Sequence, residues 1–439
     1  MTTNTNSQWL DKFEKQEWVE LLKPLLAESK EEYSYADHRE FQKAILTLSR
    51  DTNFRPSLND GITLIQLIGT DIEIGGRRED HFSEVAIYLE NFHHPKFIEA
   101  IETQYATCPV NQRAGLICVL ACQDPEPAAK ALNRLIEAHG FPRAYPRVVS
   151  TLSRRTEVLH YYVRAFVEAP GRNIGDAVNL INLAVDREHL DPGQLNALAS
   201  LVEARAKKLI AEVREQQAAA RGQWQSDEKY FYLRSDLGAY LDLVGIIPSA
   251  STSIVRDALD LEDPLIALFL VTALTTKGEA VPASVIHRAA QSYETLTGLY
   301  RNLRRARQLH LFPKERETFE HFAAAEMVQW LLYPSELGEE PKAIELMMQV
   351  DGTGENGEAE RWCLWRFTDH DGATYAGISG PYAKQAVEEP SPDTVHSNNV
   401  FSNFTPWEEA TAEEHLSSVL ETLRNWRTQW CGPSRMPPS

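Results

Sequence analysis

Apolar residues recur at three- and four-residue steps through most of the chain, which is the period of an amphipathic helix. Near the N-terminus this pattern predicts helices over residues 9–27, 37–49 and 83–91, while residues 61–74 suit either a strand or a short helix. From Pro95 onward, predicted helices of about 12 to 17 residues alternate with short connections, as expected for helix pairs that pack on their neighbours. The pattern predicts a mostly α fold, with a helical-repeat array over residues 1–335.

An Asp-Pro pair stands at three predicted helix starts: Asp124-Pro125, Asp191-Pro192 and Asp263-Pro264. The aspartate accepts hydrogen bonds from the free N–H groups of the first turn, and proline is tolerated at the first helical position. The pairs are 67 and 72 residues apart, each close to twice the ~34–47 residue unit of common helix-pair repeats. A long helix is predicted over residues 193–221, and residues 222–227 are a predicted break between two helical halves.

Residues 263–293 combine an Asp-Pro opening, an apolar first helix, a glycine at its end (Gly278) and a second helix from Pro282. This order resembles the HEAT-repeat-like α-solenoid superfamily, and the resemblance covers about residues 95–335. It implies a concave surface that binds proteins or peptides, and it carries no catalytic residues across. Because the spacing is uneven, a non-repetitive helical bundle is the alternative.

The pattern changes across residues 312–348. Pro313 opens a helical segment whose apolar face includes Phe319 and Leu331, and Tyr333 before Pro334 ends it, because a residue before proline is pushed out of the α region. Glu326 lies close to that apolar face. It is either a buried functional acid or an acid at the edge of the face that pairs with an arginine of the preceding helix.

After residue 335, alternation and turn signals predict a small α/β domain over residues 336–439. Residues 343–350 are a candidate strand, and residues 361–368 and 374–379 flank Asp371-Gly372, a strong hairpin signal. Residues 384–400 are predicted to form a long loop. A final helix is predicted over residues 411–430, where Thr411 and Glu414 fit a capping box.

The formal net charge of −19 limits the classes of partner. It argues against nucleic acid, because phosphate binding depends on lysines and arginines that release counterions, and equally against an anionic membrane surface. It permits the electrostatic steering of a basic protein.

The cysteines and the apolar runs bear on the compartment. No basic region followed by an apolar run opens the sequence, so we expect no signal peptide, and residues 264–274 are too short an apolar run to span a bilayer. The five cysteines lack CxxC spacing, which favours a reducing cytoplasm over a disulfide framework or a zinc finger. Cys118 and Cys122 are expected in the core. The histidines lack metal-ligand spacing, and we expect no cofactor.

The clearest basic island in this acidic chain is formed by Arg301, Arg304, Arg305 and Arg307. On a helix the first three share a face, which suits a phosphate or an acidic peptide. The alternative is a solvated face that pairs with acidic residues of the chain itself, such as Glu315, Glu317 or acids of the next helix.

Five of the nine tryptophans lie in the final 78 residues, which makes the C-terminal domain a candidate binding module. Trp362 and Trp365 are three positions apart on one predicted strand, so their side chains point to opposite faces of the sheet. Both faces must therefore be covered by other parts of the protein. One face is expected to pack under the final helix. The other packs on the helical array or presents a partner site with Phe401, Phe404 and Trp407, because aromatic residues are enriched at binding hot spots. The same residues also suit the core of a small domain.

These observations favour a non-catalytic protein–protein interaction or scaffold protein that binds another protein or peptide. One concrete form is a neutralising partner of a basic protein, such as an immunity protein bound to a toxin. The alternative is an enzyme, or a sensor of a small molecule or anion, with a site between the helical array and the C-terminal domain, built from Arg301, Arg304, His370 or His415.

Overall fold

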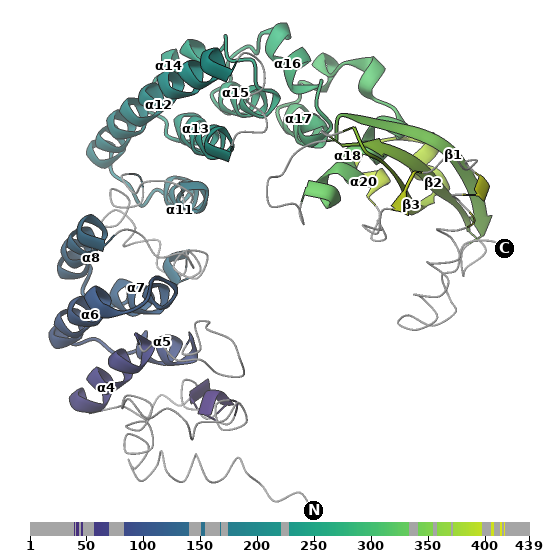
Figure 1. Ribbon diagram of the computed structural model, residues 1–439. Coiled ribbons are helices and arrows are strands. Elements are labelled where there is room, and N and C mark those ends of the chain that lie inside the picture. The colour runs from purple at the N-terminus through teal and green to yellow at the C-terminus, as the bar shows by residue number, and fades with distance from the viewer. Residues whose placement is uncertain are drawn as a thin grey trace, which may run out of the picture. The chain divides into compact units, whose positions relative to one another are not determined.

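The computed structural model describes residues 39, 41–43, 45–46, 57–69, 83–139, 151–153, 167, 174–220, 228–332, 341–353, 358–369, 372–396, 405–407, 413–414 and 417. It is mostly helical, with a small antiparallel sheet near the C-terminus, which confirms the predicted fold class (Figure 1). The chain divides into two compact units, Met1–Val202 and Glu203–Ser439. The division falls within α12 (Pro192–Ala220). The predicted break at residues 222–227 lies outside the described residues, and a domain boundary at residue 336 stays a prediction.

The first unit is built from helices, most of which pack on near neighbours in the sequence. They are α4 (Leu58–Ile68), α5 (Ser83–Leu89), α6 (Pro95–Thr107), α7 (Arg113–Ala121), α8 (Pro125–His139) and α11 (Ile174–Asp186), with a 3-10 turn at Val110–Gln112. Helix α4 packs on α5 and α6, and α7 packs on α5, α6 and α8. Since α7 is buried on every side, it forms the centre of this core, and Cys118 and Cys122 are buried in or beside it as predicted.

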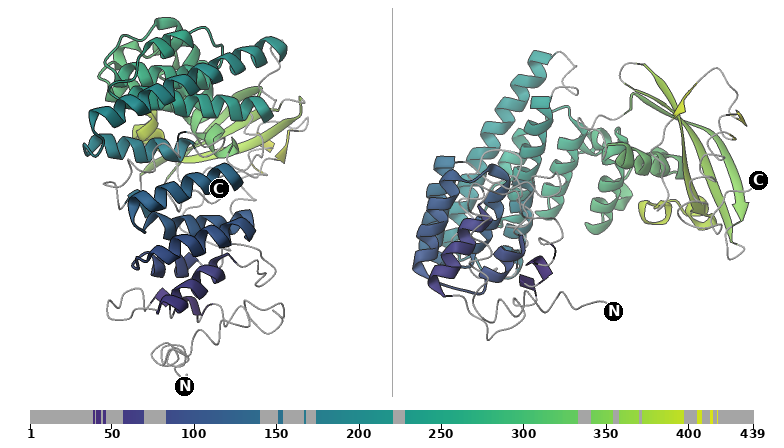
Figure 2. Two further views of the ribbon diagram at one scale, coloured as in Figure 1. Left: turned by 90° about the vertical axis from the view of Figure 1, so that its left-hand side faces the viewer. Right: turned by 60° about the horizontal axis from the view of Figure 1, so that its bottom comes forward.

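The helices of the second unit follow the same rule. They are α13 (Glu228–Ile246), α14 (Ser253–Asp257), α15 (Pro264–Thr276), α16 (Ala283–Ala289), α17 (Tyr293–Arg305) and α18 (Phe319–Leu332), with 3-10 turns at Leu309–Leu311 and Lys314–Arg316. Helix α15 packs on α13, α16 and α17, and α17 packs on α18. Within each unit the helices lie side by side along the chain (Figure 2).

The three Asp-Pro pairs mark helix starts, as predicted, because α8, α12 and α15 begin at the proline of each pair. At α15 the Asp263 side chain accepts hydrogen bonds from the backbone N–H groups of Leu265 (2.7 Å) and Ile266 (3.0 Å). At α12 the Asp191 side chain accepts from the backbone of Gln194 (2.8 Å), and the Gln194 side chain accepts in return from the backbone of Asp191 (2.8 Å). Both satisfy N–H groups that an α-helix leaves unpaired at its first turn.

The sheet has four antiparallel strands in the order β1 (Ala343–Thr353), β2 (Ala359–Thr368), β3 (Thr374–Ala383) and β4 (Thr405–Pro406). The predicted hairpin is β2–β3, with Leu364 opposite Ile378. Gly372 in its turn has φ +88°, a conformation that glycine adopts at no steric cost. The pairing of β1 with β2 shifts at a bulge between Leu346 and Met348.

The prediction of a long loop over residues 384–400 is wrong, because two short helices form there: α19 (Lys384–Glu388) and α20 (Pro392–Val395). Each is too short to show the periodic pattern from which a helix is predicted. The local signal is the cap of α20, where Ser391 and Thr394 bond each other's backbone N–H groups through their side chains. Of the predicted final helix, Glu413, Glu414 and Ser417 are helical, and the rest lies outside the described residues.

Side chains on both faces of the sheet are buried, as the parity of Trp362 and Trp365 predicted. On one face, Trp362 forms a cluster with Leu364, Ala376 and Ile378, against which Met347, Met348, Val350 and Trp407 pack. The other face carries Trp365 and lies on the side of α18, where the rings of Phe319 and Tyr382 meet edge to face at 5.1 Å. The sheet is therefore packed on α18.

Candidate functional site

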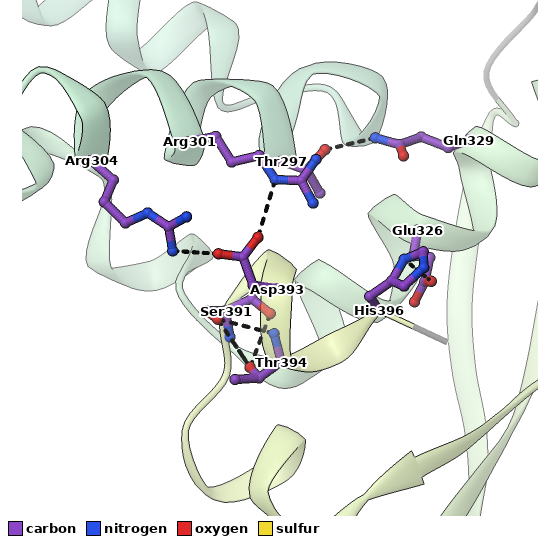
Figure 3. A network of polar contacts seen from close by, with 9 residues as sticks. All are labelled: Thr297, Arg301, Arg304, Glu326, Gln329, Ser391, Asp393, Thr394 and His396. Carbon is purple, nitrogen blue, oxygen red and sulfur yellow. Dashed lines mark hydrogen bonds and ion pairs between the residues drawn. The ribbon is translucent and has the colours of Figure 1, made fainter. Parts of the chain in front are cut away.

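The arginine face of α17 binds a carboxylate of the chain itself, Asp393 of α20 (Figure 3). Arg301 Nε lies 3.4 Å from Asp393 Oδ1, and Arg304 Nη1 forms an ion pair with Asp393 Oδ2. The three side chains are 46, 50 and 46% exposed. The face is thus paired with an acid of the chain, which was one of the two expectations, but the acid belongs to α20 and is neither Glu315 nor Glu317. We call these three residues the Asp393 contact.

Local sequence positions both sides of the Asp393 contact. Helix α17 is capped by Ser292, whose side chain accepts a hydrogen bond from the backbone of Glu294 (3.1 Å). Arg304 lies in its last turn, where cations complement the helix dipole, and Arg301 lies one turn earlier. On the other side, Pro392 and Val395 are buried and fix α20, so that Asp393 between them points outward to α17. Thr394 adds a hydrogen bond to the carbonyl of Glu389 (2.7 Å).

A second contact joins the same elements close by. His396 Nδ1 at the end of α20 lies 3.2 Å from Glu326 Oε1 on α18 (Figure 3). The Glu326 side chain is 8% exposed, whereas that of His396 is 59% exposed. One alternative from the sequence was that Glu326 lies at the edge of the apolar face and pairs with an arginine of the preceding helix. This alternative is wrong, because Glu326 is buried and contacts a histidine 70 positions later in the sequence. No spacing rule connects residues this far apart.

Beneath these contacts lies a buried polar cluster on the sheet. The Trp365 indole N–H donates to the Ser379 hydroxyl at 2.8 Å, and both side chains are buried. Burial raises the pKa of Tyr382, and the nearby Glu326 carboxylate raises it further. Burial also raises the pKa of the Cys363 thiol to about 12, so this cysteine stays protonated at neutral pH and is no nucleophile. The cluster fits a structural role between sheet and helix.

The remaining residues singled out from the sequence fall into three groups. Arg305 and Arg307 are exposed, and the backbone of Arg307 has φ +59° just after α17. Trp362 and Trp365 are 1 and 2% exposed and belong to the core, while the ring of the partly buried Trp407 lies 5.6 Å from the Arg366 guanidinium. Phe401, Phe404, His370 and His415 lie outside the described residues.

The arrangement holds α20, and with it the sheet, on α17 and α18. In the part of the chain that the structure describes, no three histidine, cysteine, aspartate or glutamate side chains gather in a way that would hold a metal ion. No helix of that part has the length and apolar character needed to cross a bilayer. Comparisons of the chain with models of known families, with curated proteins and with solved structures find no match.

Proposed function

We propose that the chain is a non-catalytic protein that binds a basic protein partner. The observation that carries this proposal is the uneven distribution of charge. Residues 336–439 contain 18 acidic and 7 basic residues, a net charge of −11 out of the −19 of the whole chain. Two of the four arginines of the strongest basic island, Arg301 and Arg304, are already paired with Asp393.

The helices supply the second support. We propose that they form a HEAT-like array, in which each unit contacts only its neighbours. Three side-chain amides join helices or connections that are about one helix pair apart in sequence: Gln123 to the carbonyl of Phe92 (31 residues), Asn302 to Thr272 (30) and Gln329 to Thr297 (32). A similar offset in both units is what repeated helix pairs produce. Arrays of this kind bind proteins along extended surfaces.

The concrete form of the proposal is a neutralising partner, such as an immunity protein that binds a toxin, in the cytoplasm. An acidic domain attracts a basic protein at long range and raises the association rate at low ionic strength. The buried thiols of Cys108, Cys118, Cys122 and Cys363 fit a reducing compartment. Nucleic acid does not fit as a partner, because its phosphates would meet an excess of carboxylates.

The test is affinity capture with the immobilised full chain, at about 50 mM and about 500 mM salt, where charges are screened differently. We expect a basic protein to be recovered at low salt, to co-elute with the chain at a fixed stoichiometry, and to be lost at high salt. Recovery of no partner at low salt would overturn the proposal, as would a partner whose affinity does not depend on salt.

A further inference from the structure

Strand β1 lies at one end of the sheet order, so one of its sides is an edge. Among the described residues, β1 pairs with β2 alone. It is 11 residues long and contains no proline, whereas β4 at the opposite end has two residues. A long edge strand offers a row of backbone N–H and C=O groups to which another strand can pair.

The side chains along this edge are partly buried on both faces of the sheet. Because of the bulge after Leu346, Ile344 and Leu346 lie opposite Phe367 and Trp365, whereas Met348 and Val350 lie opposite Leu364 and Trp362 on the other face. Glu345, Gln349 and Asp351 are exposed. An added strand would place side chains beside the partly buried apolar residues of each face.

The stretch of sequence that contains β1 is also where the negative charge of the chain is densest. Residues 336–360 contain eight acidic residues and one basic residue, Lys342. Two of the acids pair across to β2, Glu345 with Arg366 and Asp351 with Arg361, yet their side chains remain 50 and 70% exposed. Glu358, just before β2, is exposed as well.

We propose that the outer edge of β1 binds an extended, basic segment of the partner as an added β-strand. This inference rests on the proposed function and names its surface. Main-chain hydrogen bonds to β1 supply affinity, and the surrounding acids select lysine and arginine side chains. A second copy of this chain fits the edge poorly, since pairing of two β1 strands would bring two acidic segments together and like charges on paired strands are destabilising.

The experiment uses the full chain and a synthetic peptide of ten alternating lysine and valine residues, at low salt. Hydrogen exchange measures the backbone amides of β1 with and without the peptide. We expect the outward amides of β1 to become protected. A peptide of the same sequence with every residue N-methylated has the same charge but no backbone donors, and we expect it to give no protection.

A matched pair of variants locates the site. Gln349→Lys with Glu358→Lys changes the charge at the edge by +3 at two exposed positions, and we expect it to weaken peptide binding roughly tenfold. Glu215→Lys with Ala219→Lys makes the same change on the exposed surface of α12, and we expect less than about a twofold effect.

The outcomes separate this inference from the proposed function. No binding of the peptide, equal binding of the N-methylated peptide, or equal effects of the two variants would overturn strand addition. Protection of β1 in a dimer of the free chain would overturn it too, by making a second copy the occupant. In each case a basic partner captured by the full chain would leave the proposed function standing. Capture of no partner would remove the proposed function whatever the peptide does.

Discussion

Two aspartates in the second unit each meet an arginine and cap or flank a helix, but in opposite surroundings. Asp263 is fully buried, and besides the cap of α15 it accepts a hydrogen bond from the Tyr230 hydroxyl (3.0 Å) and lies 3.8 Å from Arg234. Asp393 is about half exposed and meets only the ends of Arg301 and Arg304. The same pair of residue types therefore makes a structural centre in one place and a weak surface contact in the other.

The reason is desolvation. A buried carboxylate that loses its partners leaves uncompensated charges and dipoles in the interior, whereas water replaces a lost partner at the surface. The buried case extends into a network, since Gln217 donates to the Tyr230 hydroxyl (2.8 Å) and Arg234 also lies 3.6 Å from Glu294. This network joins α12, α13, α15 and α17.

The largest expected effect is that of Asp263→Ala. It removes the cap of α15 and leaves Arg234 without its buried partner, so we expect the free energy of unfolding of the second unit to fall by roughly 3–5 kcal/mol. Urea unfolding followed by hydrogen exchange in α13 and α15 measures it, since a chain of two units need not unfold in one step. Asp263→Asn, which keeps an acceptor for the cap, should cost clearly less, and equal losses would show that the cap is not what matters.

A buried carboxylate that lacks hydrogen bonds like those of Asp263 should lower the stability of the fold when it is charged. Asp242 on α13 has a buried Oδ1 with no hydrogen-bond partner, and burial raises its pKa to about 7. The folded state holds this proton more tightly than the unfolded chain. The contribution of Asp242 to the free energy of unfolding is therefore largest near pH 4 and falls as the pH rises to about 7. We expect Asp242→Asn to flatten this slope and to raise the free energy of unfolding at pH 8 by roughly 1–3 kcal/mol. Unchanged dependence on pH from 4 to 8 would contradict it.

A smaller effect is expected from Tyr230→Phe. It removes the hydroxyl between Gln217 and Asp263 but keeps the ring, so we expect a loss of about 1–2 kcal/mol, measured in the same urea experiment. In combination with Asp263→Ala the two losses should not add, because both remove one shared hydrogen bond. Full additivity would mean that the network does not act as a unit.

The smallest effect is that of Asp393→Ala. Half-exposed ion pairs contribute about 0–1 kcal/mol, so we expect a loss within that range, which disappears in about 1 M salt. Exchange of the backbone amides of α20 is the measurement. Lys384→Ala, which breaks an exposed ion pair with Glu388 on α19, is the matched control. A loss above about 2 kcal/mol, well outside the usual range, would mean that the contact at Asp393 behaves like the one at Asp263.

The difference between the two aspartates also explains what the sequence could predict. The start of α15 was predictable because Asp263, Pro264 and the N–H groups they serve lie within one turn. The hairpin was predictable for the same reason, from Asp371-Gly372 and its flanking strands. The partner of Arg301 and Arg304 was not, since Asp393 lies on a one-turn helix about 90 residues later and is brought there by packing.

The tryptophans show the same limit on the sheet. Opposite parity predicted that Trp362 and Trp365 need cover on both faces, and both are buried. The alternation of side chains alone could not show whether each tryptophan belongs to the core or to a partner site. The answer depends on which helix or strand packs on each face of the sheet. For Trp365 the answer is the side of α18, through contacts of Phe319 and Tyr382 that no local pattern encodes.

The packing of helices on near neighbours in the sequence has a consequence for biosynthesis. Bonds such as Gln123 to Phe92 and Gln329 to Thr297 can form once about 30 further residues have left the ribosome, so the helices can assemble as they are translated, N-terminal part first. The contact of Arg301 and Arg304 with Asp393 must wait until about 90 further residues have been made. A nascent chain stalled before residue 393 would therefore expose a basic face that the finished protein neutralises.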